Sequence, residues 1–134
     1  MSLIIDSSLW VDFLRAKTPA KIKQQVVPLV NAADAVLCEP IKFEILRAAL
    51  RHERTTIESI FATLPTLPTP ADLWERSAAL GQKCLGHGFR PPAMDLLIAQ
   101  IAIEHQAELV TFDAHFAQIA KVSSLKTRSL ERAS

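Results

Sequence analysis

The stretch LIIDSSLWVDFL at residues 3–14 decides the fold class of this chain. Residues 3–5 are aliphatic without an alternating polar residue, which predicts a short strand that is buried on both faces. Ser7 or Ser8 can cap a helix over 9–16, whose apolar residues recur at helical spacing. A buried strand followed at once by an amphipathic helix favours an α/β arrangement.

The rest of the chain continues this alternation of strands and helices. Mostly apolar stretches predict further strands at 35–38 and 107–112, and residues 125–128 are expected to form a last edge strand. The proline-rich segment 64–70 is expected to hold only a short or edge strand. Helical periodicity predicts helices at 20–33, 41–52, 56–64, 71–85, 91–105 and 114–120. Pro28 is expected to bend or end the first of these. The order predicts a three-layer α/β/α sandwich with a central parallel sheet, formed by one domain over 1–134.

Composition and charge exclude several classes of protein. Hydrophobic residues at 49% and charged residues at 22% are typical of a globular domain and not of a disordered chain. The net charge of +1 means that any nucleic-acid contact depends on a local patch. Cys38 and Cys84 show no metal-ligand spacing, which argues against a disulfide framework and a zinc site. With no basic leader and no uncharged stretch of about 18 residues, we expect a cytoplasmic protein without a membrane segment.

Four carboxylates are expected at the carboxyl edge of the sheet, where parallel α/β proteins bind ligands. Asp6 and Asp113 follow strands, and Glu44 and Asp95 are expected early in helices that start from the same edge. Taken singly, Asp6 and Asp113 could be helix caps, and Glu44 could pair with Arg47 on the surface. Asp95 is different, because it lies on an otherwise apolar or small helix face, where an unpartnered carboxylate costs several kcal/mol.

Together the four acids predict a site for a divalent cation. Without counter-charge they would repel one another, and a set of oxygen ligands without cysteine favours Mg²⁺ or Mn²⁺ over zinc or copper. Carboxylate-held Mg²⁺ suits attack by water on a phosphodiester. A serine hydrolase is excluded because no G-x-S-x-G motif is present, and three glycines are too few for a nucleotide-binding loop. A phosphorelay receiver would need a paired acid after the first strand, where Ser7 and Ser8 follow a single Asp6.

These residues resemble a known family. LIIDSSLWVDFL at 3–14, Glu44 in PIKFEILRAAL, Asp95 in PPAMDLLIAQIAIEHQAELVTFD and Asp113 in TFDAHFAQI are similar to PIN-domain ribonucleases of the VapC toxin type, over nearly the whole chain. The resemblance implies an endoribonuclease that depends on Mg²⁺ or Mn²⁺, cleaves RNA to inhibit translation, forms a homodimer and is held inactive by a small cognate antitoxin. It implies catalytic and metal-binding roles for Asp6, Glu44, Asp95 and Asp113, and a role for the Ser8 hydroxyl in orienting Asp6.

One position departs from the pattern of the family. Many relatives carry a further acid two residues after the last aspartate, and this chain has His115 there. A second metal would then be held weakly or only with RNA bound. This substitution keeps open the alternative of a catalytically silent PIN-like module that binds RNA or a protein. Candidate phosphate contacts in either case are Arg15, Lys42, Arg47, Arg51 and Arg90.

Overall fold

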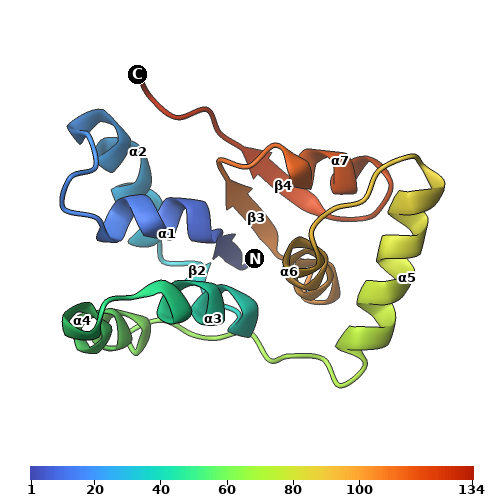
Figure 1. Cartoon of the computed structure of the whole chain (residues 1–134), viewed down its shortest axis with the longest axis horizontal. Coiled ribbons are helices and arrows are strands. Elements are labelled where there is room, and N and C mark those ends of the chain that lie inside the picture. The colour runs from blue at the N-terminus through green and yellow to red at the C-terminus, as the bar shows by residue number, and fades with distance from the viewer.

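The computed structural model describes all residues from 1 to 134, and its centre is a parallel sheet (Figure 1). The strands are β1 (Leu3–Ile5), β2 (Ala35–Val36), β3 (Glu108–Thr111) and β4 (Lys126–Ser129), in the order β2-β1-β3-β4. Leu3 pairs with Ala35 on one side and with Glu108 on the other. Because β1 and β3 are parallel neighbours, their carboxyl ends lie side by side, as the sequence predicted.

The two edges of the sheet differ in how much of their backbone is covered by further chain. Beyond β2, the Leu37 amide donates a hydrogen bond to the Pro65 carbonyl, and the Leu67 amide donates one to the Leu37 carbonyl, both at 2.8 Å. These bonds form a single parallel bridge, which is the short strand expected within 64–70. At the other edge, β4 is exposed along most of its length. The predicted edge strand at the end of the chain is therefore present.

Seven helices surround the sheet. They are α1 (Ser7–Leu14), α2 (Ala20–Val30), α3 (Glu39–Ala48), α4 (Arg51–Phe61), α5 (Leu73–Gly86), α6 (Ala93–Glu104) and α7 (His115–Lys121). In Figure 1, α1 to α4 occupy the left and lower part of the view and α5 to α7 the right part. Each helix contributes buried apolar side chains to one core that also contains all of β1. The fold is the predicted three-layer α/β/α sandwich, and none of its helices has the length and apolar character needed to cross a membrane.

The prediction of a single helix over 41–52 is wrong, because this range contains the end of one helix and the start of the next. α3 and α4 are separated by Ala49-Leu50, and α4 begins well before the expected start of the 56–64 helix. The side chain of Glu53 explains the break, since its Oε1 accepts a hydrogen bond from the Leu50 amide at 2.8 Å and so caps the start of α4. Apolar periodicity continues across this point, so only the cap reveals the boundary.

Pro28 lies inside α2 and does not end it. A proline within a helix removes one backbone hydrogen bond, and α2 continues for only two residues beyond Pro28, to Val30. The expectation of a helix extending to residue 33 was therefore too long at its carboxyl end.

The C-terminal residues 130–134 form hydrogen bonds and an ion pair with side chains of α1 and α2. Gln25 of α2 donates a hydrogen bond from Nε2 to the Glu131 carbonyl and accepts one at Oε1 from the Ala133 amide, both at 2.8 Å. Arg132 places Nη1 and Nη2 each 3.0 Å from an oxygen of Asp12, whose side chain is only 4% exposed. The segment therefore supplies the partner of a buried charge in α1.

Candidate active site

The four predicted carboxylates come from four separate elements. Asp6 follows β1, Asp113 lies in the turn after β3, and Asp95 is in the first turn of α6. Glu44 lies in the middle of α3 and not near its start, because the helix begins at Glu39, two residues earlier than expected. Burial first, and then the charges of the other three carboxylates, raise the pKa of Asp95 to about 6. The four groups therefore act electrostatically as one cluster.

Asp6 is buried and held by two hydroxyl groups. Its Oδ2 accepts hydrogen bonds from Ser8 Oγ at 2.9 Å and from Thr111 Oγ1 at 2.7 Å. Each hydroxyl oxygen in turn accepts a backbone N–H, from Phe112 at 3.2 Å for Ser8 and from Asp113 at 2.8 Å for Thr111. Each hydroxyl therefore accepts a hydrogen bond from a backbone amide and donates its own proton to Asp6 Oδ2. Neither hydroxyl donates to Oδ1, and the backbone amides of Ser7 and Ser8 also interact with this carboxylate.

Glu44 is turned toward this cluster by a residue of α1. Ser7 Oγ donates a hydrogen bond to Glu44 Oε1 at 3.2 Å. Burial and, to a smaller extent, the charge of Asp6 raise the pKa of Glu44, while the Ser7 hydrogen bond and the charge of Arg47 lower it. Glu44 is therefore not the surface partner of Arg47 that its spacing allowed.

The pKa of Asp6 is shifted in the same direction as those of Glu44 and Asp95. Burial raises the pKa of Asp6, and its hydrogen bonds to Thr111 and Ser8 offset part of that rise. Three of the four carboxylates, Asp6, Glu44 and Asp95, therefore have a raised pKa with burial as the first cause. Carboxylates in this condition bind protons or cations more readily than isolated ones.

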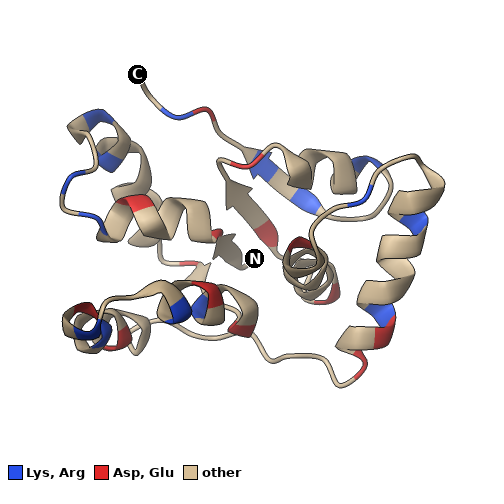
Figure 2. Ribbon diagram, viewed as in Figure 1, with Lys and Arg blue, Asp and Glu red and all other residues tan.

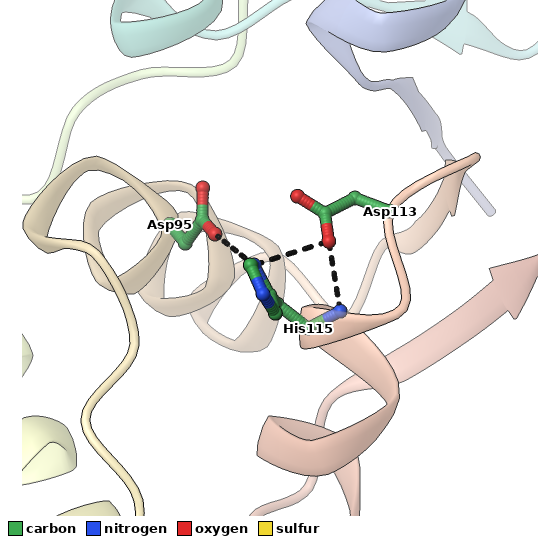
Figure 3. A group of neighbouring side chains, drawn as sticks. All are labelled: Asp95, Asp113 and His115. Carbon is green, nitrogen blue, oxygen red and sulfur yellow. Dashed lines mark hydrogen bonds and ion pairs between the residues drawn. The ribbon is translucent and has the colours of Figure 1, made fainter.

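His115 lies between two of the acids (Figure 3). Its Nδ1 is 3.1 Å from Asp113 Oδ1 and 3.7 Å from Asp95 Oδ2. The His115 amide also donates a hydrogen bond to Asp113 Oδ1 at 2.9 Å, so Asp113 caps the turn into α7 while it faces Asp95. One ligand atom from each of the three residues lies within 4.8 Å of the others. His115, noted in the sequence only as a departure from a pattern, is thus part of the cluster.

The residues present fit a divalent cation. No lysine or arginine pairs with any of the four carboxylates, and the neutral hydroxyls that hold Asp6 and Glu44 leave their negative charge in place. A cation within the cluster would relieve the repulsion that contributes to the raised pKa of Asp95. Carboxylate oxygens are the donors that suit Mg²⁺ and Mn²⁺.

Two residues of the site were missed from the sequence. Thr111 is the last residue of β3 and stands two positions before Asp113 in the string TFD, so its place at the carboxyl end of a buried strand was a usable signal. Ser7 stands beside Asp6 in the string DSS, where it was considered only as a helix cap. Both hydroxyls bind an acid that is distant in sequence, and such contacts appear only once the fold is known.

The chain is similar to known proteins over nearly its whole length. The chain matches the family described as PIN domain over residues 3–122. It is 35% identical over 132 residues to VapC ribonuclease Mb1587 of Mycobacterium bovis and to Ribonuclease VapC11 of Mycobacterium tuberculosis, and each match covers 95% of this chain and 98% of the relative.

Solved structures share the fold. VapBC2 from Rickettsia felis, bound to a DNA fragment from the promoter, aligns with a TM-score of 0.75 and 18% identity over 98% of this chain and 100% of that one. DNA-bound VapBC from Salmonella typhimurium aligns with a TM-score of 0.75 and 14% identity over 96% and 98%. The sequence and the fold agree over nearly the whole length, and the chain belongs to the PIN domain family, with VapC ribonucleases as its relatives.

Proposed function

We propose that this protein is a metal-dependent endoribonuclease that acts as the toxin of a toxin–antitoxin pair. The observation that carries the proposal is the convergence of Asp6, Glu44, Asp95 and Asp113 from four elements onto one edge of the sheet. Three of them have a raised pKa, and none is neutralised by a lysine or arginine. The mycobacterial relatives, 35% identical to this chain, are named ribonucleases. This relationship supports RNA as the substrate.

In this proposal the four carboxylates hold Mg²⁺, with Mn²⁺ as a substitute. Bound there, the cation would supply an activated water and neutralise negative charge at the phosphodiester. The protein's own contribution is preorganisation. Ser8 and Thr111 hold Asp6 in one orientation, and Ser7 holds Glu44. The acids therefore need not rearrange when the cation arrives.

We further propose a small antitoxin as the inhibitor. The solved structures with this fold include a toxin–antitoxin complex from Klebsiella pneumoniae, which aligns with a TM-score of 0.71 at 19% identity. An arginine from such a partner could pair with two of the four carboxylates through its planar guanidinium and exclude the cation. We also expect the protein to act as a homodimer in the cytoplasm, where cleavage of RNA would inhibit translation.

A silent module that binds RNA or protein without cleavage is the second candidate. It is favoured by His115, which places an imidazole ring at a position where many relatives have an acid. Its Nδ1 lies 3.1 Å from Asp113, so the ring competes with a cation for that oxygen. The two candidates differ in metal binding and in turnover.

The test is RNA cleavage by the purified protein in Mg²⁺, in Mn²⁺ and in EDTA. We expect cleavage with either metal, none in EDTA, and a loss of at least ~100-fold in Asp6→Asn, which removes a charge that the cation needs and preserves the shape of the side chain. Asp34→Asn is the matched control, because Asp34 is exposed and away from the site. Sequencing of RNA ends after brief induction of both proteins would identify the cleaved RNA.

Calorimetry with Mn²⁺ separates the two candidates. A nuclease should bind Mn²⁺ and lose this binding in Asp6→Asn. If Mn²⁺ does not bind, or binds without any cleavage of RNA, the silent module is the better description. Harmless overexpression of the folded wild-type chain, together with recovery of no small partner from the host, would contradict the role as a toxin.

A further inference from the structure

A hollow of about 260 Å³ opens from the acidic site between α1, α3 and α4. Its lining includes Ser7 and Glu44 of the acidic site, a second carboxylate, Glu53, and the two basic residues Arg15 and Arg47. Figure 2 shows basic residues on α3 and in the turn between α1 and α2. The hollow therefore joins the negatively charged cluster to two positive charges.

Both of these arginines are free of ion pairs. Four other arginines of the chain are engaged by carboxylates, namely Arg54, Arg76, Arg128 and Arg132. Arg47 has an acid three residues before it on the same helix, which is the usual spacing for a pair. That acid, Glu44, is turned away toward Ser7. The guanidinium of Arg47 is consequently available to an external anion, as is that of Arg15.

The chemistry of the hollow suits a strand of RNA. The protein has a net charge of only +1 and an acidic centre, so attraction of a polyanion to this edge of the sheet depends on basic side chains close to the site. A guanidinium binds phosphate through two parallel hydrogen bonds. Most of the remaining lining is apolar, with Val11, Leu14 and Ile45, which favours contact with a base or ribose. The further acid there, Glu53, is hydrogen-bonded through Oε1 to the Leu50 amide at the start of α4.

We propose that Arg15 and Arg47 bind a phosphate of the RNA strand next to the one that is cleaved. This inference rests on the proposed ribonuclease function and adds to it the path of the substrate, which runs from the carboxylates over Ser7 and into the hollow between α1 and α3. Of the five basic residues that the sequence left as candidate phosphate contacts, only these two line the hollow. They fix the register of the strand, and the carboxylates perform the chemistry.

The experiment measures the affinity of a labelled single-stranded RNA for Arg15→Ala and Arg47→Ala. Ca²⁺ is used in place of Mg²⁺ to limit turnover, and the salt concentration is varied from about 50 to 200 mM. Each lost phosphate contact should lower the slope of log affinity against log salt by about 0.7. Affinity should fall about tenfold per variant, which is the loss of one charge-assisted hydrogen-bonded contact. In Mg²⁺, KM should rise with little change in kcat.

Two other arginines provide matched controls. Arg51 and Arg90 are also exposed and without ion pairs, but they lie outside the hollow. Arg51→Ala and Arg90→Ala should leave the slope and the affinity unchanged. Equal losses in all four variants would mean a diffuse charge effect and would overturn the proposal. All four sites are exposed, so unchanged melting temperatures should establish that each variant is folded.

The design separates this inference from the proposed function. If the wild-type protein neither binds nor cleaves RNA, the ribonuclease function itself fails. If it cleaves RNA while Arg15→Ala and Arg47→Ala behave like the controls, only the phosphate site fails. If these two variants lose binding of a protein partner and keep their affinity for RNA, the hollow receives an acidic protein segment and the proposal is wrong.

Discussion

Replacing Asp95 by asparagine should stabilise the metal-free protein at neutral pH. The asparagine keeps the shape of the side chain and removes its charge. The pKa of Asp95 rises from 3.8 to about 6, and the side chain is only partly buried, so solvent screening reduces the effect of this shift on stability. A rise of roughly two pKa units corresponds to about 3 kcal/mol, at about 1.4 kcal/mol per unit. We take this value as the upper end of the stabilisation.

The direction of the pH dependence follows from the raised pKa. The folded protein holds the proton of Asp95 more tightly than the unfolded chain does. The resulting stability is fully present below pH 3.8 and is lost as the pH rises through about 6. Asparagine imitates the protonated form at every pH. The wild type and Asp95→Asn should therefore be similar near pH 4, and the variant should be more stable at pH 7.5.

The assay is thermal and urea unfolding at both pH values, in EDTA and in Mg²⁺. For a chain of this length, 1 kcal/mol shifts the melting temperature by about 3 to 4 °C, so the variant should gain up to about 10 °C at pH 7.5 in EDTA. Mg²⁺ should stabilise the wild type more than the variant, because the ion binds the folded wild type more tightly. Asp34→Asn should change little in any condition. A variant that is no more stable than the wild type in EDTA at pH 7.5 would refute the reasoning.

Three further changes test other parts of the structure. Thr111→Val removes a hydroxyl that donates to Asp6 and leaves the Asp113 amide unpaired, so we expect cleavage to fall about 10- to 100-fold. Thr111→Ser should recover the activity, and an equal kcat in the two variants would contradict this role of the hydroxyl. Arg132→Ala leaves the buried carboxylate of Asp12 without its partner and should lower the free energy of unfolding, measured in urea, by about 1–3 kcal/mol. The loss should be smaller than for a fully buried ion pair because Arg132 is half exposed, and Asp12→Asn should lower the free energy of unfolding less than Arg132→Ala does. Mg²⁺ or Mn²⁺ should raise the melting temperature of the wild type and support cleavage, Ca²⁺ should support little cleavage, and equal activity in EDTA would remove the metal from the mechanism.

The sheet could be predicted from the sequence because its strands are local signals. Residues 3–5 are aliphatic throughout, the stretch 107–112 is mostly apolar, and each is followed by an aspartate and then a helix. Since all strands are parallel, Asp6 and Asp113 had to emerge at the same edge. These two positions of the candidate site therefore needed no knowledge of tertiary contacts.

Other features could not be read in this way because partners distant in sequence decide them. Glu44 lies at the edge of the apolar stripe of its helix, and its spacing equally allows a pair with Arg47; only the Ser7 hydroxyl on another helix resolves this. Asp12 carries no local sign of burial, since its partner Arg132 is 120 residues away. The first contact depends on how α1 packs against α3 and the second on where the C-terminal segment lies, and no periodicity encodes either.

The way in which the acids are held has a consequence for regulation. Lysine or arginine partners would hold Asp6 and Glu44 just as firmly, but they would neutralise the cluster permanently. Hydroxyl groups fix the orientation of these carboxylates and leave their charge intact. The repulsion that raises the pKa of Asp95 therefore persists in the folded protein until a cation enters. In the proposed mechanism, Mg²⁺ and an antitoxin arginine relieve the same repulsion at the same oxygens, so each should weaken the binding of the other.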